Sequence, residues 1–502
     1  MDLNLILDMA VSGHGDRVAV TGPGRAVTYQ ELSRGAAAGA ALARTKGADA
    51  ITFVAANHVA YPAALFAAAA AGLPFIPLNY RLADTQLEPL MAAYPRALVV
   101  TERLSLPGAD PALSLTRQEF LDELSSDTPT VPSPAVPDDV AVLLYTSGTS
   151  GAAKAAILRH RHLAAYVLGT VEFGSATEEE GALVTVPPYH IAGLANLLSN
   201  LYAGRRITYL DPFDPATWLA TVRDEGTTQA MVVPTMLARI VTYLDGRDAC
   251  VPTLRTLSYG GSRMPLPVLE EALARFGDTG FVNAYGLTET SSTIALLGPD
   301  DHRAALRADD STARARLTSV GRLVPGVEVE VRDAHGSVLP LGEPGLVLLR
   351  GEQISGEYEG ESALDAEGWF PTKDWGWVDR DGYLFIEGRA DDTIIRGGEN
   401  ISPAEIEDVL VRHPAVTDAA VVGVPDDEWG QRIAAVLCVE GPPPATEELQ
   451  AWIRGRLRSS KTPDIIQFTD ELPRTHTGKL LRREVLAWLQ ATAGDGQDVV
   501  SR

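Results

Sequence analysis

The first half of the chain alternates short apolar runs with stretches whose apolar positions recur at helical spacing. The runs at 49–58 and 138–148 are apolar enough to form buried strands. Residues 28–45 show helical periodicity, and Thr28 followed by Glu31 matches a capping box. Strands that alternate with helices predict a fold built from parallel α/β layers.

The longest apolar run, residues 62–78, contains Gly72, Pro74 and Pro77. A membrane-spanning helix needs about 20 apolar residues, so we interpret this interrupted run as an alanine-rich buried helix followed by a strand. The first residues of the chain lack a basic segment ahead of their apolar part, which argues against a signal peptide. We therefore expect a cytoplasmic protein without a membrane span.

The pattern changes near residue 318, where short β-rich runs and glycine-containing turns predict a small antiparallel sheet or barrel. After residues 388–392 another α/β pattern begins, with a helix over 402–413 that has Ser402 as N-cap and Pro403 at its first position. A chain of this length is expected to form a large domain and at least one smaller one. The predicted boundaries are an N-terminal domain at 1–388, a hinge at 389–392, a C-terminal domain at 393–495 and a tail at 496–502.

The composition narrows the classes of partner. The 502 residues carry 42 basic and 66 acidic side chains, a formal net charge of −24. Nucleic acids and anionic membranes are bound by clustered Lys and Arg, so neither is expected as a partner. The two cysteines, Cys250 and Cys438, cannot form a disulfide framework or a zinc cluster, and we expect both thiols to be buried. The sequence does not predict the oligomeric state.

A run of small hydroxyl residues, glycines and one lysine, YTSGTSGAAKAA (145–156), follows a predicted strand. It is not a Walker loop, because Ala153 and Ala155 stand where that motif needs glycine and a hydroxyl residue. It is not an esterase elbow either, because Gly151 directly follows Ser150. A loop of backbone N–H groups and hydroxyls suits a polyphosphate; the alternative is a mobile surface loop.

This run resembles the phosphate-loop signature of the adenylate-forming superfamily, which comprises acyl- and aryl-CoA ligases, nonribosomal adenylation domains and luciferases. Further segments resemble later signatures of that superfamily in the same order. These segments are NAYGLTET (283–290), GWFPTKDWGWVDRDGYLFIEGRADDTI (368–394), RGGENISPAEIE (396–407) and PRTHTGK (473–479), with weaker matches at 27–32 and 77–82. The resemblance covers almost the whole chain and is closest to acyl- or aryl-CoA ligases.

The resemblance implies a large N-terminal domain of α/β layers with a small β-rich subdomain, and a smaller, mobile α+β C-terminal domain. It also implies a reaction in two halves. A carboxylate first attacks the α-phosphate of ATP in the presence of Mg²⁺, which forms acyl-AMP and pyrophosphate. The thiol of CoA then attacks the acyl-AMP and releases AMP. The first half brings anions together and therefore needs cations and oriented donors.

The nucleotide site implied by this resemblance draws on segments far apart in the chain. Residues 146–154 would grip the β- and γ-phosphates, Tyr285 would stack on adenine, and Asp374 with Arg389 would bind the ribose. The complete set is Thr146, Ser147, Gly148, Thr149, Ser150, Lys154, Gly260, Gly261, Ser262, Asn283, Ala284, Tyr285, Gly286, Asp374 and Arg389. Outside these motifs, Tyr285 would be interpreted as a core aromatic and Arg389 as a surface arginine.

The catalytic residues implied by the resemblance are Lys479, Glu289 and Thr288. Lys479 would bridge the incoming carboxylate and the α-phosphate, Thr288 would bond the α-phosphate, and Glu289 would ligate Mg²⁺, which prefers carboxylate oxygen. Asp391 would be the hinge about which the C-terminal domain rotates after adenylation. Gly397 and Gly398 would then line the thiol channel, since glycine permits a close backbone approach.

The acid pocket implied by the resemblance combines His190, Ile191, Ala192, Ala195, Ser258, Ser292 and Thr293. His190 stands where the superfamily has a histidine or aromatic residue that closes the pocket. Members that activate amino acids carry an aspartate just after that position, whereas residues 191–195 contain no acid. A buried ammonium group without a partner is costly, so an α-amino acid is disfavoured. We predict an aromatic, alicyclic or medium-chain carboxylic acid as the substrate.

CoA is the favoured acceptor, because the chain stops soon after Lys479 without an appended carrier domain. Two alternatives stay open: a stand-alone enzyme that loads the acid onto a separate carrier protein, and an enzyme that passes the acyl-AMP to a non-thiol acceptor. A nucleotide-binding protein without ligase activity is the alternative from another class. The joint presence of Lys479 and Glu289 argues against it.

Three positions depart from the superfamily pattern. Lys373 stands where glycine is frequent, and Ala153 and Ala155 stand where relatives usually have proline and glycine. The sequence does not determine whether Lys373 contacts the nucleotide or points to solvent. The two alanines are expected to change the flexibility of the loop rather than remove a ligand. The histidines of RHRH (159–162) lack neighbouring acids or cysteines, so we interpret them as the start of a helix rather than a metal site.

Overall fold

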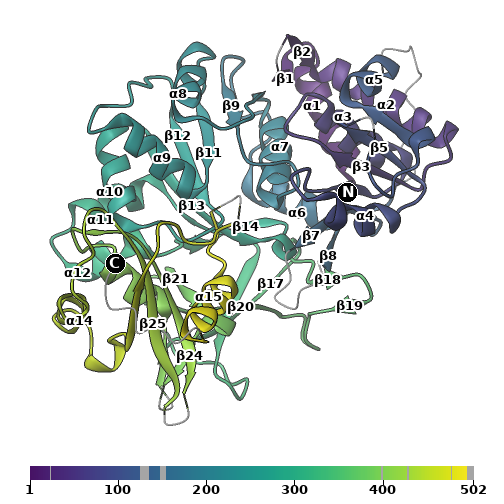
Figure 1. Ribbon diagram of the computed structural model, residues 1–502. Coiled ribbons are helices and arrows are strands. Elements are labelled where there is room, and N and C mark those ends of the chain that lie inside the picture. Colours follow the sequence, from purple (N-terminus) through teal and green to yellow (C-terminus); the bar gives the residue numbers. More distant parts are fainter. Residues whose placement is uncertain are drawn as a thin grey trace.

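The computed structural model describes residues 1–22, 24–103, 105–124, 135–146, 154–396, 399–426, 429–475 and 478–494. Six predicted site residues lie outside this part of the chain: Ser147, Gly148, Thr149, Ser150, Gly397 and Gly398. The predicted tail at 496–502 lies outside it as well, and of Thr146 only the backbone is described. The described residues form a large N-terminal domain and a smaller C-terminal domain, the latter drawn in green to yellow (Figure 1).

The larger of two mixed sheets in the N-terminal domain has nine strands in the order β15-β14-β13-β12-β11-β9-β10-β1-β2. All pairings from β13 to β1 are parallel, and the pairings at both edges are antiparallel. Its strands are β1 (Val18–Gly22), β2 (Arg25–Thr28), β9 (Gly181–Val184), β10 (Arg206–Tyr209), β11 (Gln229–Val232), β12 (Thr256–Gly260), β13 (Gly280–Leu287), β14 (Ser292–Leu297) and β15 (Arg322–Leu323).

The second sheet has eight strands in the order β19-β18-β8-β7-β4-β3-β5-β6, and it is parallel from β7 to β6. Its strands are β3 (Ala50–Val54), β4 (Phe75–Pro77), β5 (Ala97–Thr101), β6 (Ser114–Thr116), β7 (Val140–Thr146), β8 (Lys154–Arg159), β18 (Glu357–Tyr358) and β19 (Glu361–Ser362). The strands predicted at 49–58 and 138–148 are β3 and β7. The prediction of parallel α/β layers is therefore confirmed.

Helices connect the strands of both sheets. They are α1 (Leu3–His14), α2 (Tyr29–Thr45), α3 (Ala60–Ala71), α4 (Asp84–Ala92), α5 (Arg117–Glu123), α6 (His160–Thr170), α7 (Ile191–Ala203), α8 (Pro215–Asp224), α9 (Pro234–Leu244), α10 (Leu266–Arg275), α11 (Pro299–Arg307) and α12 (Ser311–Ala315). The capping box of α2 is confirmed: Thr28 Oγ1 accepts the Glu31 N–H at 3.1 Å, and the Thr28 N–H donates to Glu31 Oε2 at 2.8 Å.

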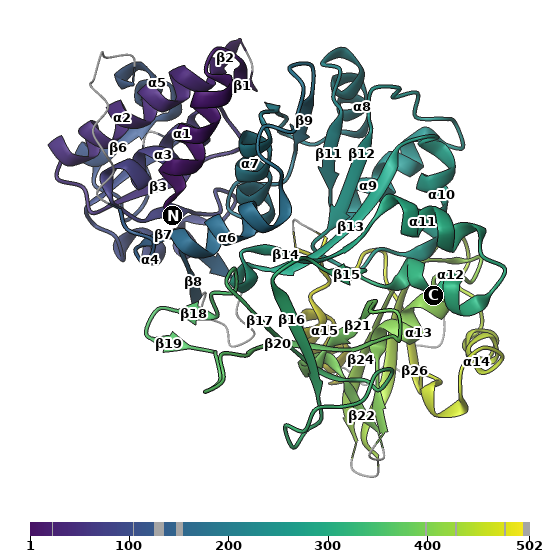
Figure 2. The ribbon, with the colours of Figure 1, turned by 180° about the vertical axis from the view of Figure 1, so that it is seen from behind.

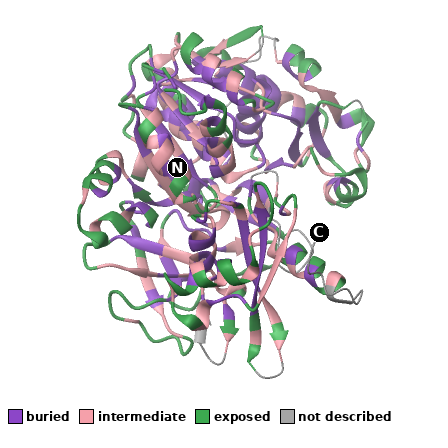
Figure 3. Ribbon diagram, turned by 60° about the vertical axis from the view of Figure 1, so that its left-hand side comes forward, coloured by how far each residue is buried: buried purple, intermediate pink, exposed green. Residues whose placement is uncertain are grey.

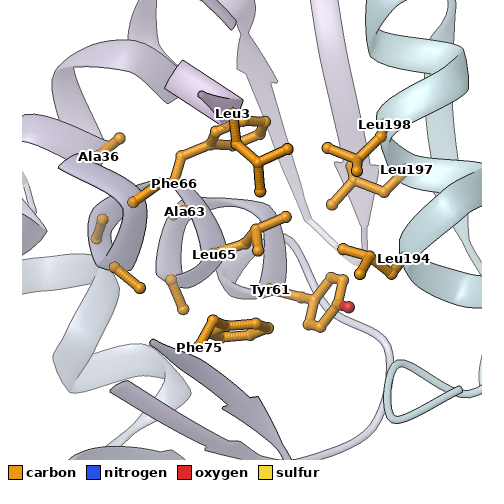
Figure 4. Close-up of a cluster of buried hydrophobic side chains, with 14 of the residues drawn as sticks. Leu3, Ala36, Tyr61, Ala63, Leu65, Phe66, Phe75, Leu194, Leu197 and Leu198 are labelled. Carbon is orange, nitrogen blue, oxygen red and sulfur yellow. The ribbon is translucent and has the colours of Figure 1, made fainter. Parts of the chain in front are cut away.

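The alanine-rich run forms α3, which is buried along nearly its whole length, and the strand β4 follows it as predicted. Small side chains let α2 approach closely, since a Cβ added at Gly39 would lie 2.7 Å from the Cβ of Ala67. Tyr61, Leu65 and Phe66 of α3 face the same core as Leu3 of α1 and leucines of α7 (Figure 4). Figure 3 shows buried residues gathered in such central elements and exposed residues in outer loops.

A four-stranded antiparallel sheet follows, with the order β16-β17-β20-β21. Its strands are β16 (Val327–Arg332), β17 (Gly345–Gly351), β20 (Phe370–Val378) and β21 (Leu384–Arg389). This confirms the small antiparallel sheet predicted for the region after residue 318. Seen from either side, the sheet lies between the α/β layers and the C-terminal domain (Figures 1 and 2).

The C-terminal domain is built on a three-stranded sheet, β24-β25-β26, with apolar clusters on its two faces. Its elements are β22 (Ile394–Arg396), β23 (Glu399–Ile401), α13 (Pro403–Leu410), β24 (Val416–Asp426), β25 (Gly430–Val439), α14 (Thr446–Arg454), β26 (Ile465–Phe468) and α15 (Arg482–Gly494). The helix predicted over 402–413 ends earlier, at Leu410. Ser402 is its N-cap residue, but the hydroxyl donates to the Glu387 carbonyl at 2.8 Å instead of capping the helix.

The two cysteines differ in their exposure to solvent. Cys438 is buried, but Cys250 is exposed, so the prediction of two buried thiols is wrong for Cys250. Cys250 lies in a surface connection with a left-handed φ of 51°.

His160 and His162 are buried at the start of α6, where the sequence predicted the start of a helix. Among the described residues, no group of three or more His, Cys, Asp or Glu is arranged to hold a metal ion. None of the described helices has the length and apolar character of a membrane span.

Acid should destabilise the fold through His162. Its burial, followed by the charge of Arg161, lowers its pKa to about 4 from 6.5. Between these values the unfolded chain binds the proton and the folded chain does not, so stability is full above pH 6.5 and falls as the pH drops towards 4. At pH 5 the burial of neutral His162 lowers the free energy of unfolding by about 2 kcal/mol. Urea unfolding of His162→Gln should show a smaller loss between pH 7 and pH 5 than the wild type.

The matched control is His335→Gln, because His335 is exposed. This variant should lose as much stability between the two pH values as the wild type. The contribution assigned to His162 is refuted if His162→Gln loses as much as both of them.

Candidate active site

Several of the predicted nucleotide residues that the structure describes lie towards the carboxyl ends of β12 and β13, which is the usual ligand edge of a parallel sheet. Gly260 ends β12 and pairs with Ala284 of β13. A Cβ added at Gly260 would lie 2.2 Å from the Ala284 carbonyl oxygen, and one at Gly286 would lie 1.8 Å from that of Ser292. Glycine is therefore required at both positions. These close strand contacts bring Gly261 and Ser262 beside the β13 segment from Asn283 to Gly286.

A buried carboxylate lies at the centre of this group. Asp374 of β20 is only 5% exposed and pairs with Arg389 of β21, whose Nε lies 3.2 Å from Asp374 Oδ1. The hydroxyl of Tyr285 donates to the other oxygen of Asp374. Burial raises the pKa of Asp374, although the Arg389 charge and the Tyr285 hydrogen bond oppose that shift. The structure thus joins three predicted nucleotide residues directly, through contacts between β13 and the antiparallel sheet.

Thr372 supports the same pair, although the sequence did not single it out. Arg389 Nη1 donates to the Thr372 carbonyl at 2.7 Å, and the Asp374 N–H donates to Thr372 Oγ1 at 3.0 Å. Between Thr372 and Asp374, Lys373 is exposed and has a left-handed φ of 62°. Glycine adopts this conformation without strain, which explains its frequency at this position in the superfamily. Lys373 itself is exposed in the structure.

Lys479 lies in the connection between β26 and α15. Arg474 holds this connection, because its Nη1 donates to the Gly478 carbonyl at 2.8 Å while Nη2 pairs with Asp418 at 2.8 Å. A Cβ added at Gly478 would lie 2.2 Å from the Thr235 side chain, at the start of α9. The connection therefore touches the N-terminal domain directly. Thr235 was not identified from the sequence, and no local pattern marks it.

The ammonium group of Lys479 interacts with the charges of the nucleotide site. Desolvation lowers its pKa most, Arg389 lowers it further, and the carboxylates of Asp374, Asp392 and Glu289 raise it; the net pKa is lowered. The side chain keeps access to solvent, which screens these interactions. The structure thus places Lys479 of the C-terminal domain within electrostatic range of Glu289 and Asp374, which lie more than a hundred residues away in the chain.

Glu289 and Thr288 lie in a 3₁₀ turn, η2 (Thr288–Thr290), directly after β13. The backbone carbonyl of Glu289 accepts the N–H of Ser355 at 2.8 Å, and its carboxylate accepts a hydrogen bond from the Tyr358 hydroxyl. Lys154 begins β8, pairs with Glu361 at 3.0 Å and lies 5.8 Å from the centre of the Tyr358 ring. Tyr358 therefore contacts both predicted phosphate-site groups, yet nothing in its local sequence singles it out.

The predicted acid-pocket residues lie on α7 and on strands of the nine-stranded sheet. His190 is the N-cap residue of α7, which continues with Ile191, Ala192 and Ala195 and contacts β14. Ser292 and Thr293 begin β14, and Ser258 lies on β12. Burial, followed by the charge of Arg81, lowers the pKa of His190 to about 4. Its imidazole is therefore neutral at pH 7, and its ring lies 4.6 Å from that of Tyr189.

The donor set fits a nucleotide with a hard cation. Glu289 and Thr288 supply oxygen atoms, which Mg²⁺ prefers, and Mg²⁺ is commonly held by one or two carboxylates together with substrate phosphates. Lys154 and Glu289 both contact Tyr358, and Lys479 of the C-terminal domain lies within electrostatic range of Glu289. The buried Asp374 carboxylate has the acceptor atoms that a ribose diol needs.

Comparison with known proteins identifies the family. The model described as AMP-binding enzyme matches residues 7–359, and that of the AMP-binding enzyme C-terminal domain matches residues 405–479. The chain belongs to the AMP-binding enzyme family. The adenylate-forming resemblance of its motifs is thereby confirmed.

Similar proteins in this family include ligases of several acids. A feruloyl-CoA synthase from Amycolatopsis sp is 35% identical over 93% of this chain and 95% of its own length. The fatty acid–[acyl-carrier-protein] ligase ScoC from Streptomyces coeruleorubidus is 33% identical over 93% of this chain and 92% of its own length. Among solved structures, the o-succinylbenzoate CoA synthetase MenE of Bacillus subtilis is 26% identical.

MenE has been solved in two relevant complexes. Its complex with the acyl-adenylate intermediate OSB-AMP has a TM-score of 0.82 and covers 96% of this chain and 97% of that one. Its complex with ATP and a magnesium ion has a TM-score of 0.81 and covers 95% of this chain and 98% of that one. The fold of the present chain is thus that of an adenylate-forming enzyme.

Proposed function

We propose that the protein is an ATP-dependent ligase that joins an aromatic carboxylic acid to CoA through an acyl-AMP intermediate. The observation that carries this proposal is that the connection bearing Lys479 packs against Thr235 of the N-terminal domain, which places its ammonium group within electrostatic range of Glu289 and Asp374. These groups combine a cation, a ligand for Mg²⁺ and a ribose acceptor, which are the elements needed to bring a carboxylate to an α-phosphate. The similarity to a feruloyl-CoA synthase and to o-succinylbenzoate CoA synthetase supports the aromatic acid.

In the first half-reaction, an oxygen of the acid attacks the α-phosphorus of ATP and pyrophosphate leaves. Asp374 and Arg389 hold the ribose, and residues 146–154 hold the β- and γ-phosphates. Lys479 neutralises the approaching carboxylate and the α-phosphate, so the two anions can come together. Glu289 would ligate Mg²⁺, which would supply positive charge opposite the phosphates when bound. Thr288 hydrogen-bonds the α-phosphate.

In the second half-reaction, the thiol attacks the acyl carbon and AMP leaves. We assign the domain boundaries to 1–388 and 393–495, with 389–392 as the hinge that contains Asp391. The 3₁₀ turn η4 (Ala390–Asp392) joins the domains at that point. A rotation there would withdraw Lys479 and break the contact between Gly478 and Thr235, as well as the ion pair between Arg263 and Asp408. Gly397 and Gly398 would then line the thiol channel.

The acid is expected to bind between α7 and β14. Ile191, Ala192 and Ala195 offer apolar surface, and the neutral His190 closes the pocket without adding a charge. Ser258, Ser292 and Thr293 supply hydroxyls for ring substituents of the acid. Gly260, Gly261 and Ala284 border both the acid and the adenine.

A second acceptor has a specific observation in its favour. ScoC, 33% identical to this chain, is named as a fatty acid–[acyl-carrier-protein] ligase. A stand-alone enzyme that loads a carrier protein is therefore the second candidate, with a medium-chain acid as its substrate.

A panel of acids scored by pyrophosphate release tests the function. Cinnamic, arylacetic and benzoic acids should release pyrophosphate, with medium-chain fatty acids weaker. Each active acid is then tested with CoA, with a phosphopantetheinyl carrier protein and with a simple amine, and AMP release should be fastest with CoA. Activity confined to α-amino acids would contradict the assigned pocket, and faster AMP release with the carrier protein would establish the second candidate.

A further inference from the structure

A strap formed by residues 353–361 connects the two predicted phosphate-site elements. At one end, Gln353 Nε2 donates to the carbonyls of Thr290 at 3.0 Å and Thr293 at 2.9 Å. Next to it, the Ser355 N–H donates to the Glu289 carbonyl, and the Ser355 hydroxyl donates to that of Ile157 in β8. The strap is thus fixed both to the turn that carries Glu289 and to the strand that begins with Lys154.

Strand pairing sets the position of Tyr358 on this strap. Tyr358 pairs with Ala156 of β8 on one side and with Glu361 of β19 on the other. Its hydroxyl donates to Oε1 of Glu289, and its ring lies 5.8 Å from Nζ of Lys154. One side chain therefore spans from the predicted metal ligand to the predicted phosphate cation.

We propose that Tyr358 is a positioning residue that orients the Glu289 carboxylate as a ligand for Mg²⁺ and nucleotide. This inference rests on the proposed function. A hydrogen bond to Oε1 restricts the rotation of the carboxylate before the metal arrives. Residues that orient metal ligands in this way typically change metal affinity 10- to 100-fold when they are replaced, that is, by about one to two orders of magnitude.

The ring of Tyr358 has a second effect on the same site. An ammonium group within about 6 Å of an aromatic ring centre is attracted to the ring face. Lys154 also pairs with Glu361, which lies opposite Tyr358 in the neighbouring strand. The strap thereby sets the separation between Lys154 and Glu289, and a change that removes only the hydroxyl should disturb Glu289 while sparing Lys154.

The experiment measures metal binding without turnover. Mn²⁺ replaces Mg²⁺ and is titrated by electron paramagnetic resonance in the presence of a non-hydrolysable ATP analogue and no acid. In Tyr358→Phe the Kd of Mn²⁺ should rise about tenfold. The Kd of the analogue in EDTA should stay within about twofold of wild type, because the ring and Lys154 are retained. The thermal unfolding midpoint verifies that the variant is folded.

Tyr243→Phe is the matched control, because it removes a phenol hydroxyl from an exposed tyrosine of α9. Its Mn²⁺ affinity should equal that of the wild type. A Glu289→Gln protein should bind Mn²⁺ weakly, and adding Tyr358→Phe to it should weaken binding no further, because the hydroxyl acts through the Glu289 carboxylate.

Two outcomes would overturn the inference: an unchanged Mn²⁺ affinity in folded Tyr358→Phe, or a tenfold loss that persists in full in the Glu289→Gln background. Failure of the proposed ligase activity would give a different result from failure of the inference about Tyr358. A wild-type protein that binds Mn²⁺ with the analogue but releases no pyrophosphate with any acid would contradict the ligase activity. The metal-binding difference between wild type and Tyr358→Phe would still support the role of Tyr358.

Discussion

Lys479→Ala should lower the rate of acid-dependent ATP–pyrophosphate exchange by a factor of about 10²–10³. Lys479 brings a positive charge from the C-terminal domain to the carboxylates of Glu289 and Asp374. During adenylation an anionic acid must approach an anionic phosphate, so the loss of this charge raises the barrier of that step. The affinity for ATP should change much less, because the ribose and phosphate contacts assigned to the N-terminal domain remain.

Separate assays of the two half-reactions distinguish a catalytic role of Lys479 from a structural one. When preformed acyl-AMP and CoA are supplied, Lys479→Ala should form the thioester at nearly the wild-type rate, since the proposed rotation withdraws Lys479 in that step. Lys46→Ala is a suitable control, because Lys46 is exposed and donates to the Ala112 carbonyl at 3.0 Å, far along the chain from the site. An exchange rate within twofold of wild type in Lys479→Ala would refute the mechanism.

Asp374→Asn should weaken ATP and AMP binding by about 10- to 100-fold, since hydrogen bonds to a charged group contribute about 1.5–3 kcal/mol. The amide oxygen can still accept the Tyr285 hydroxyl, but it loses the charge that Arg389 and the ribose hydroxyls require. Burial already disfavours the Asp374 carboxylate and raises its pKa. The folded state therefore loses little when this charge is removed, and affinity should fall far more than stability. Isothermal titration with AMP and urea unfolding measure the two quantities.

Asp365→Asn provides the comparison within the same part of the fold. Asp365 pairs with Arg332 of β16 at 3.0 Å, and its carboxylate accepts the Trp369 N–H at 2.9 Å. Its replacement should leave AMP affinity unchanged. Equal AMP affinities for Asp374→Asn and the wild type would show that Asp374 does not bind the ribose.

Much of the fold could be predicted because the relevant signals are local. The capping box of α2 depends on Thr28 and Glu31, three positions apart, and the buried character of α3 follows from a continuous apolar run. The exposure of Cys250 and the early end of α13 could not be predicted in this way. The exposure of Cys250 depends on where its connection lies on the surface, and the end of α13 depends on how the following strand packs. Neighbouring residues in the chain do not determine either outcome.

In the candidate site, too, residues within a sequence motif were predicted, whereas residues that act through tertiary contacts were not. The motifs identified Lys479, Glu289, Asp374, Tyr285 and Arg389 through their resemblance to a family. They did not identify Tyr358 and Thr372, which hold some of those residues, or Thr235, which contacts Gly478 next to Lys479. The supporting residues share no sequence pattern, because most of their contacts are with distant parts of the chain. Lys373 looked like a departure at the nucleotide site, whereas its exposure and left-handed backbone explain it.

The sequence by itself therefore determined the α/β layers, the order of a large and a smaller domain, and the family. Periodicity, caps and motifs are carried by residues close together in the chain, so they can be read without a fold. Only the tertiary structure decided that Lys479 comes within electrostatic range of Glu289 and Asp374, and that Tyr358 spans from Glu289 to Lys154. Those contacts arise when two sheets and a second domain pack together, since packing joins residues that no local pattern relates.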